Sequence, residues 1–346
     1  GTTLTRTVDE SSNSDAALNL TGSAVVFITA AAGDVFQGEL FAENPSSPTA
    51  PSATGTNAVA IGSGVTSSGF GSFVGGWGST ASGSDSVALG STNIASGTHA
   101  FAVGGGSATA SGSRAIAIGY ASDATANEST AVGRTAQARA TNSNAFGYNS
   151  YAITGSGATA IGNSYASGAD SFAAAIANNT SSYGAKANNA IAMGQLAKAD
   201  DHSVAVAIGY STHSSGAGSV ALGYDAHATG NYGVGIGKSA RSSGAEAVAI
   251  GQNASAGGSN AVALGNGATA SASNAYSFGG TASGTSAYSF GGTASGTSSV
   301  NLRGAEASGD YSLAVGQQSV ASIYGQKAFA SGYFAANGDA QGSTFI

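Results

Sequence analysis

The sequence predicts an all-β fold, a parallel β-roll or β-solenoid in which coils of about fourteen residues stack into a rod. Three observations predict it. A glycine returns almost every fourteen residues from Gly62 to Gly332. Each glycine closes a small apolar phrase, such as Ala247-Val248-Ala249-Ile250 before Gly251. Within each phrase the side chains alternate with a period of two, which is the period of a strand and not of a helix.

We call the recurring residues the anchor glycines. They are Gly62, Gly76, Gly90, Gly104, Gly119, Gly133, Gly147, Gly162, Gly194, Gly209, Gly223, Gly237, Gly251, Gly265, Gly279, Gly291, Gly316 and Gly332. The spacing shortens to twelve residues where the segment 275–286 repeats without change at 287–298. The gap from Gly162 to Gly194 fits two enlarged units. About twenty coils at the strand spacing of about 4.8 Å predict a rod of roughly 95 Å.

Each coil is expected to contain two short strands and two tight turns. In the first strand, Val248 and Ile250 are expected to face the core, and the alanines to face outward, where they would let a neighbouring chain approach. In the second strand, Ala226 and Ala228 are expected to point inward and His227 outward. So thin a coil holds little core, and we expect several rods, most simply three, to pack together.

Two 12-residue units carry aromatic side chains in the Val and Ile columns. These are Tyr276 and Phe278 in one unit, and Tyr288 and Phe290 in the next. Because shorter turns accompany larger side chains there, we expect these aromatic rings to fill the core of the two coils.

Proline marks the boundary before the repeats. The three prolines are Pro45, Pro48 and Pro51, and proline at this spacing predicts a stiff extended linker. We therefore assign residues 1–42 to a small N-terminal β module, 43–56 to a Pro/Ser-rich linker, 57–336 to the β-roll, and 337–346 to the start of a following module or tail. Short β-branched and aromatic runs at 4–8, 23–29 and 35–41 are the expected strands of the first module.

Composition limits the function. The net charge is −7, charged residues make up 8% of the 346 residues, and there is no cysteine. Nucleic-acid binding requires a basic surface, so no nucleic-acid partner is expected. No thiol chemistry, no cofactor and no membrane span are expected. No signal peptide opens the chain, which is therefore expected to be a piece of a longer protein, a processed product, or a protein that is never secreted as a free chain.

The apolar phrases resemble the head repeats of the YadA-like trimeric autotransporter adhesins. The matching segments are Asn57 to Gly62, Asp85 to Gly90, Gly218 to Gly223 and Asn260 to Gly265, and the resemblance covers residues 57–332. It implies a left-handed parallel β-roll and a homotrimer, with three chains intertwined or side by side. It also implies an adhesive role at a cell surface.

The flanking segments resemble a different class of protein. Residues 1–8 and 24–30 are similar to β modules of the tail fibres of tailed phages, and residues 337–346 are similar to the opening of a module near the ends of such fibres. The resemblance implies a virion tail fibre, with adjoining fibre or stalk modules as partners.

One outward column of the second strands is a candidate binding site. It contains Lys198, His213, His227 and Arg241 in four consecutive units, which we call the basic ladder. Stacked at strand spacing, these side chains would form a stripe able to bind phosphate or the acidic sugars of a cell surface. The alternative is a solvated face whose charge is balanced by the acids Asp201, Asp225 and Glu246.

Catalysis and metal binding are not expected. His99, His202, His213 and His227 lie in no recognised catalytic motif. A metal site on His213 and His227 would lack its third and fourth ligands.

Tyrosines in the irregular stretch form the second candidate site. They are Tyr148, Tyr151, Tyr165 and Tyr183. Aromatic side chains on surface insertions often contact sugars or proteins. The alternative is that these rings only fill a wider coil.

The sequence therefore predicts a non-enzymatic, extracellular fibre that attaches to a host cell through a glycan or protein receptor. A phage tail fibre is the preferred hypothesis, and the head of a bacterial trimeric autotransporter adhesin is the alternative. An ice-binding solenoid is a third class, but it would need flat ranks of threonine, whereas the outward column is mixed in composition.

Overall fold

The computed structural model describes residues 49–177, 181–330, 336 and 341–345. All of them belong to the second of the two units into which the chain divides, Gly1–Gln37 and Gly38–Ile346. Within this part every regular element is a β-strand, and none of it forms a helix with the length and apolar character needed to cross a bilayer. The predicted N-terminal module, residues 1–42, lies outside the described residues.

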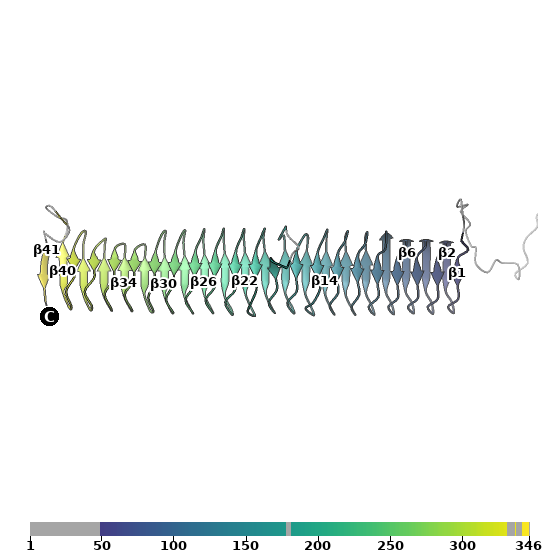
Figure 1. Ribbon diagram of the computed structural model, residues 1–346, viewed down its shortest axis with the longest axis horizontal. Helices are drawn as coiled ribbons and strands as arrows, with labels where there is room; N and C mark the ends of the chain where they lie inside the picture. Colours follow the sequence, from purple (N-terminus) through teal and green to yellow (C-terminus); the bar gives the residue numbers. More distant parts are fainter. Residues whose placement is uncertain (1–48, 178–180, 331–335, 337–340, 346) are drawn as a thin grey trace, which may run out of the picture. The chain divides into compact units, whose positions relative to one another are not determined.

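Two strands form each coil, and equivalent strands of successive coils pair in parallel (Figure 1). The longer strands build what we call the first-strand sheet. They are β2 (Val59–Ser63), β4 (Phe73–Trp77), β6 (Val87–Ser91), β8 (Phe101–Gly105), β10 (Ile116–Ile118), β12 (Thr130–Val132), β14 (Asn144–Phe146), β16 (Thr159–Ile161), β18 (Phe172–Ala174), β20 (Ile191–Met193), β22 (Val206–Ile208), β24 (Val220–Leu222), β26 (Val234–Ile236), β28 (Val248–Ile250), β30 (Val262–Leu264), β32 (Tyr276–Phe278), β34 (Tyr288–Phe290), β36 (Val300–Leu302), β38 (Leu313–Val315) and β40 (Lys327–Ala330).

The shorter strands build the second-strand sheet, which has 20 strands. They are β1 (Ser52–Ala53), β3 (Thr66–Ser67), β5 (Thr80–Ala81), β7 (Ile94–Ala95), β9 (Thr109–Ala110), β11 (Asp123–Ala124), β13 (Gln137–Ala138), β15 (Tyr151–Ala152), β17 (Tyr165–Ala166), β19 (Gly184–Ala185), β21 (Lys198–Ala199), β23 (His213–Ser214), β25 (His227–Ala228), β27 (Arg241–Ser242), β29 (Ser255–Ala256), β31 (Thr269–Ala270), β33 (Thr281–Ala282), β35 (Thr293–Ala294), β37 (Glu306–Ala307) and β39 (Val320–Ala321). One further strand, β41 (Gln341–Thr344), pairs antiparallel with β40.

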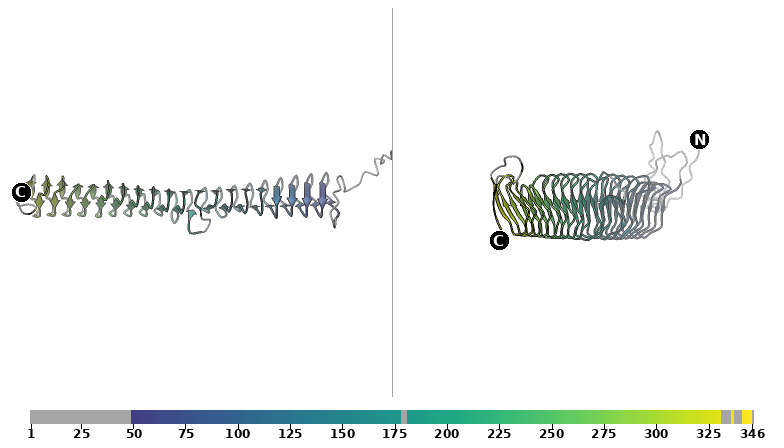
Figure 2. Two further views of the ribbon diagram at one scale, coloured as in Figure 1. Left: turned by 90° about the horizontal axis from the view of Figure 1, so that it is seen from above. Right: turned by 60° about the vertical axis from the view of Figure 1, so that its left-hand side comes forward.

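The parallel solenoid with coils of about fourteen residues is confirmed. Val206 pairs with Val220, and Val220 with Val234, so equivalent residues of neighbouring coils stand side by side. Figure 2 shows the two sheets as two rows of strands that face each other along the stack. Among the described residues, β1 already pairs with β3, and it lies inside the segment 43–56 that was assigned to the linker.

The strand register shows how the chain is divided into coils between Gly162 and Gly194. Thr159 pairs with Phe172, and Phe172 pairs with Ile191. The prediction of two enlarged units is therefore wrong, because a coil of thirteen residues precedes one of nineteen. The extra length lies in a single coil, and residues 178–180 of that coil are outside the described part.

The expected direction of the first strand is also wrong. Ala221, Ala249 and Ala263 of the first strands are fully buried, whereas Ile250 is 39% exposed. The second strands do point their alanines inward, as Ala226 and Ala228 show. A coil with two short strands brings its sheets so close together that only small side chains fit between them. The alternation was visible in the sequence, but its period alone did not say which face was buried.

The aromatic units follow the same rule. Tyr276, Phe278, Tyr288 and Phe290 do occupy the Val and Ile columns, as their pairing shows. They lie on the outer face, however, and Phe290 is 41% exposed. The prediction that these rings fill the core is wrong, for the same steric reason.

Small polar side chains complete the core. Ser219 is buried, and its hydroxyl donates to the carbonyl oxygen of Gly216 at 2.7 Å. Ser86 and Ser299 bond Gly83 and Gly296 in the same way, each at 2.7 Å. These serines stand just before the first strand, where the buried hydroxyl is satisfied by a turn carbonyl that also accepts the amide of the same serine, at 3.1 Å for Ser219 and Gly216.

The anchor glycine is required by both conformation and space. Gly209 has a φ of 128°, which side chains rarely adopt. A Cβ at this position would lie 1.9 Å from the carbonyl oxygen of Gly223 in the next coil. The turn can therefore keep its hydrogen-bonding distance to the next coil only if the residue has no side chain.

A substitution at this column tests the close approach. We expect Gly209→Ala to lower the free energy of unfolding by at least about 2 kcal/mol, because the backbone strain adds to the contact with the next coil. Gly105→Ala is the control, because a Cβ there would meet nothing within 4 Å. It should stay within about 0.5 kcal/mol of the parent chain. Equal losses in urea denaturation of the two variants would contradict this account of the anchor glycine.

Candidate functional site

The basic ladder is a continuous column of the second-strand sheet. Lys198 pairs with His213, His213 with His227, and His227 with Arg241. The alanines or serines beside them point inward, so these four side chains point outward. The structure thus brings together the four residues that the sequence grouped; their binding role stays a prediction.

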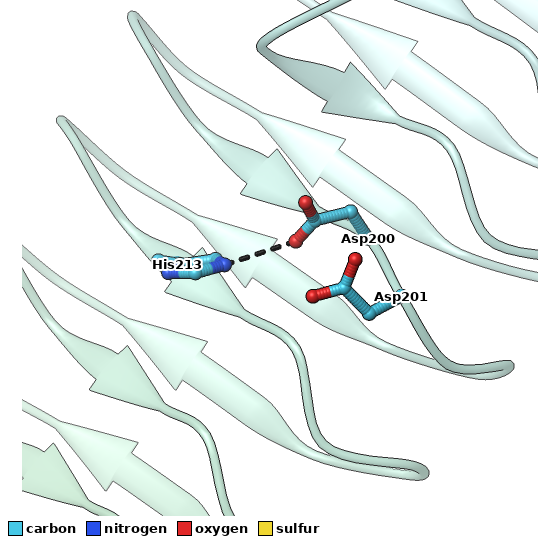
Figure 3. Close-up of side chains that lie close together, drawn as sticks. All are labelled: Asp200, Asp201 and His213. Carbon is cyan, nitrogen blue, oxygen red and sulfur yellow. Dashed lines mark hydrogen bonds and ion pairs between the residues drawn. The ribbon is translucent and has the colours of Figure 1, made fainter.

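A buried carboxylate lies at one end of the ladder. Asp200 is 2% exposed, and its Oδ2 atom lies 2.7 Å from Nζ of Lys198 and 3.2 Å from Nζ of Lys186. Its Oδ1 atom lies 2.9 Å from Nε2 of His213. Figure 3 shows His213 and Asp200 facing each other across neighbouring coils. We call Lys186, Lys198, Asp200 and His213 the ionic cluster.

The ionic cluster shifts the acidity of its carboxyl group. Burial by itself raises the pKa of Asp200, but bonds from His213, Lys198 and Lys186 outweigh burial and hold that pKa well below its usual range. Asp200 is therefore ionised at neutral pH, and its charge is compensated within the protein.

The other end of the ladder has a more exposed acid. Asp225 lies 3.5 Å from Nε2 of His227 and 3.4 Å from a guanidinium nitrogen of Arg241. Burial lowers the pKa of His227, and the charge of Arg241 lowers it further against the opposing effect of Asp225. His227 is therefore neutral at pH 7.

The balancing acids differ from those expected. The acids expected from the sequence were Asp201, Asp225 and Glu246, and Asp225 does pair with the ladder. The acid that pairs with Lys198 and His213, however, is Asp200 and not its neighbour Asp201. In most coils serine or threonine follows the inward residue of the second strand, so an aspartate after Ala199 was the signal in the sequence.

Three ligand-type side chains meet at the ionic cluster. Ligand atoms of Asp200, Asp201 and His213 lie within 4.8 Å of one another (Figure 3). Both oxygens of Asp200 are already bonded by cationic or imidazole groups, and two lysine ammonium groups would repel a metal ion there. His213 and His227, the two histidines considered for metal binding, make an edge-on ring contact, with centroids 5.8 Å apart.

The four candidate tyrosines do not form one site. Tyr151 and Tyr165 are neighbours in register on the second-strand sheet, in the same outward column as the basic ladder. We call them the aromatic pair. Tyr148 lies after an anchor glycine and is 53% exposed, with the guanidinium of Arg134 5.5 Å from its ring centroid. Tyr183 packs against the buried alanine core, which agrees with the alternative that it fills a wider coil.

The column contains one position without a side chain between its two parts. Gly184 pairs with Lys198, and a Cβ on Gly184 would lie 2.0 Å from the carbonyl oxygen of Tyr165. The aromatic pair, Gly184 and the basic ladder are thus seven successive coils of one face. Sequence spacing alone did not join them, because the nineteen-residue coil interrupts the glycine period.

The histidines bond groups other than serine hydroxyls. His213 and His227 contact acids, His202 bonds the carbonyl oxygen of Ser215 at 2.8 Å, and His99 lies 3.6 Å from Asp85. An acyl-transfer site requires a serine or similar nucleophile bonded to the imidazole. This arrangement suits ion pairing between coils.

The apolar outer face of the first-strand sheet was not expected from the sequence. The Val, Ile and aromatic columns of the first-strand sheet are half-exposed along the stack. Within them, Tyr276 stacks on Tyr288 and Phe278 on Phe290, with centroids 4.9 and 4.8 Å apart. The pattern was visible in the sequence, but it had been assigned to the core.

Removing the charge of Asp200 should destabilise its coils. At pH 7 we expect Asp200→Asn to lower the free energy of local opening by about 3 kcal/mol, because the half-buried lysines lose the buried carboxylate that compensates them. Hydrogen exchange of the Lys198 and His213 amides measures this. The Asp200 pKa is lower in the folded than in the unfolded chain, so its contribution exists above about pH 4 and is lost as the pH falls further. The difference from the parent chain should therefore shrink below that pH.

Asp225→Asn is the matched control for that experiment. The Asp225 side chain is 33% exposed and pairs with His227 and Arg241 near solvent. Exposed pairs are worth less, so its loss should cost under about 1 kcal/mol. If Asp225→Asn cost as much as Asp200→Asn, burial would not be the source of the effect.

Comparison with known protein families agrees with this geometry. No curated protein matches the chain significantly. A family model for the YadA head domain repeat (2 copies) matches residues 52–73, 81–107, 105–122, 124–150, 205–226, 228–254, 256–280 and 307–335. These segments cover more than half of the chain, and they confirm the resemblance seen in the apolar phrases. The chain belongs to the YadA head domain repeat family.

Proposed function

We propose that this protein is a non-enzymatic adhesive fibre in which three copies of the chain pack side by side through their first-strand sheets. The observation that carries the proposal is the apolar face of that sheet. It runs from β2 to β40, and its outward side chains are mainly valine, isoleucine, leucine and phenylalanine.

A single chain would leave this face in water. Ile118, Ile161 and Ile250 are 36%, 42% and 39% exposed, and equivalent residues repeat in coil after coil. Contiguous apolar surfaces of this extent mark interaction sites in soluble proteins. A partner that covers the whole face must be as long as the stack and must repeat at the same spacing.

A second copy of the same chain meets both requirements. Copies aligned in parallel present equivalent apolar columns at equal heights, and a closed ring of copies leaves no apolar face uncovered. Membership of the YadA head family supports three copies, as the resemblance to trimeric autotransporter adhesins implies. The second-strand sheet then faces away from the apolar contact and is available for attachment.

Attachment to a cell surface is the role that the family supports, with an extracellular location. Within that role we propose a phage tail fibre, because residues 1–8, 24–30 and 337–346 resemble tail-fibre modules. The alternative, the head of a bacterial trimeric autotransporter adhesin, is favoured by the match over the repeats themselves. The receptor in either case is a glycan or protein of the target surface.

The mass in solution tests the trimer. We expect the intact chain to sediment at three times its 32.8 kDa, without a monomer at micromolar concentration. Ile208→Asp combined with Ile250→Asp places charges on the apolar face and should shift the protein toward monomer by at least about tenfold. Analytical ultracentrifugation measures both. A parent chain that is stable as a monomer would contradict the proposal.

A matched variant controls for the added charge. Ser255 lies in the outward column of the second-strand sheet, near Ile250 in sequence. Ser255→Asp should leave the trimer intact, because that face does not join the copies. Dissociation of this variant would show that charge alone, and not the apolar contact, controls assembly.

The position of the fibre is tested directly by microscopy. Gold-labelled antibodies against the β-roll are applied to virions and to bacterial cells that encode the chain. Labelling of virion tails is the expected result. Labelling confined to the bacterial surface would overturn the tail-fibre assignment and support the adhesin alternative.

A further inference from the structure

We infer that the second-strand face from β15 to β27 binds an acidic polysaccharide that lies along the stack. The sugar rings contact the aromatic pair, and the acid groups contact the basic ladder. This inference rests on the proposed function and names the class of surface ligand that the fibre recognises.

The outward column of the second-strand sheet is continuous from the aromatic pair to the basic ladder. The aromatic pair and the basic ladder occupy one outward column with Gly184 between them, so the column spans seven coils. At the strand spacing of about 4.8 Å, the contact residues cover roughly 29 Å. A linear chain of sugars can follow such a straight column, whereas a compact ligand would reach only part of it.

The side chains of the column change from aromatic to basic along the stack. Tyr151 and Tyr165 are half-buried, so part of each side chain remains accessible to a ligand. Tyrosine offers an apolar ring face for stacking and a hydroxyl for hydrogen bonding. The next side chains along the column are cationic or imidazole groups. A block of ring contacts followed by a block of anion contacts is what an extended segment of an acidic polysaccharide would match.

Lys198 and Arg241 of the basic ladder have hydrogen-bond donors left for a ligand. Lys198 makes one ion pair, with Asp200, and its ammonium group has three donors. Arg241 is 52% exposed, and its guanidinium bonds Asp225 and Nδ1 of His227, which leaves part of its five donors for further bonds. Asp200 holds the Lys198 ammonium group in place, and Asp225 holds the Arg241 guanidinium. Little side-chain conformational freedom is therefore lost when an anion binds to them.

The positive charges along the column are balanced by neighbouring carboxylates. The cations Lys186, Lys198 and Arg241 lie beside the carboxylates of Asp200 and Asp225, so a free phosphate would gain little attraction. A polymer makes several contacts at once and gains from their sum. Ring stacking on the aromatic pair adds a contribution that does not depend on charge.

Biosensor measurements with defined sugars test the inference on the intact trimeric protein. The probes are a heparin hexasaccharide, a polygalacturonate hexasaccharide and neutral maltohexaose. The parent protein should bind at least one of the acidic probes and not maltohexaose. Binding of heparin alone would identify sulfate as the acid group, and binding of polygalacturonate alone would identify carboxylate. No binding of either acidic probe, or equal binding of maltohexaose, would overturn the inference.

The ladder variant avoids the buried carboxylate. His227→Ser combined with Arg241→Ser leaves the ionic cluster intact, and it should weaken binding at least about tenfold. Lys238→Ser is the matched control, because Lys238 is exposed in the same region but lies outside the column. It should change binding less than about twofold. An equal loss in the control would show attraction by net charge and would overturn the site.

The aromatic variant tests the other half of the column. Tyr151→Ser combined with Tyr165→Ser should weaken binding about fivefold, through lost ring contacts. Tyr224→Ser is its control, because Tyr224 is 53% exposed and stacks on Tyr210 in a different column. Unchanged binding in the Tyr151/Tyr165 variant would overturn the ring contacts.

Failure of this inference can be told apart from failure of the proposed function. Each variant and the parent are checked for trimer mass and for attachment to target cells. A trimer that attaches to cells but binds no acidic sugar overturns only the inference and indicates a protein receptor. A monomer, or a trimer that attaches to no cell, overturns the proposed function itself.

Discussion

The backbone hydrogen bonds between successive coils are the constraint on which this structure depends. The core of a coil contains little more than alanine methyl groups and serine hydroxyls, so packing of large side chains contributes little. The coils instead bond along both strands and through their turns. Gly223, for example, donates to the carbonyl oxygen of Ile208 at 2.9 Å. This requirement explains the anchor glycine, because a side chain at Gly209 would displace the next coil.

A fixed register makes every outward side chain part of a column. A single residue such as Arg241 therefore acquires neighbours from coils that are fourteen residues away in sequence. The same rule produces two unlike faces. The first-strand sheet carries apolar columns suited to association with identical chains, and the second-strand sheet carries a column whose chemistry changes along the stack. Under the proposed function, assembly and recognition use different faces of the same coil.

The ionic cluster shows how a local departure from the repeat is stabilised. Asp200 replaces the usual serine or threonine and becomes buried, which would be costly for an isolated charge. Lys186, Lys198 and His213 come from three different coils and compensate it. These bonds join the irregular nineteen-residue coil to the two coils that follow it. The cluster therefore stabilises the stack where the glycine period is interrupted, and it orients two members of the basic ladder.

The sequence by itself determined the coil, its length, the positions of both strands and the column of Lys198 to Arg241. These follow from local rules, because a glycine period and a two-residue alternation are properties of short segments. Only the tertiary structure decided which face of the first strand is buried, since that depends on the distance between the two sheets. Only it could identify Asp200 as the partner of Lys198 and His213, and place Tyr165 in the same column as the basic ladder. The Asp200 contacts depend on side-chain orientation between neighbouring coils. The place of Tyr165 depends on register across the nineteen-residue coil, where the sequence period provides no guide.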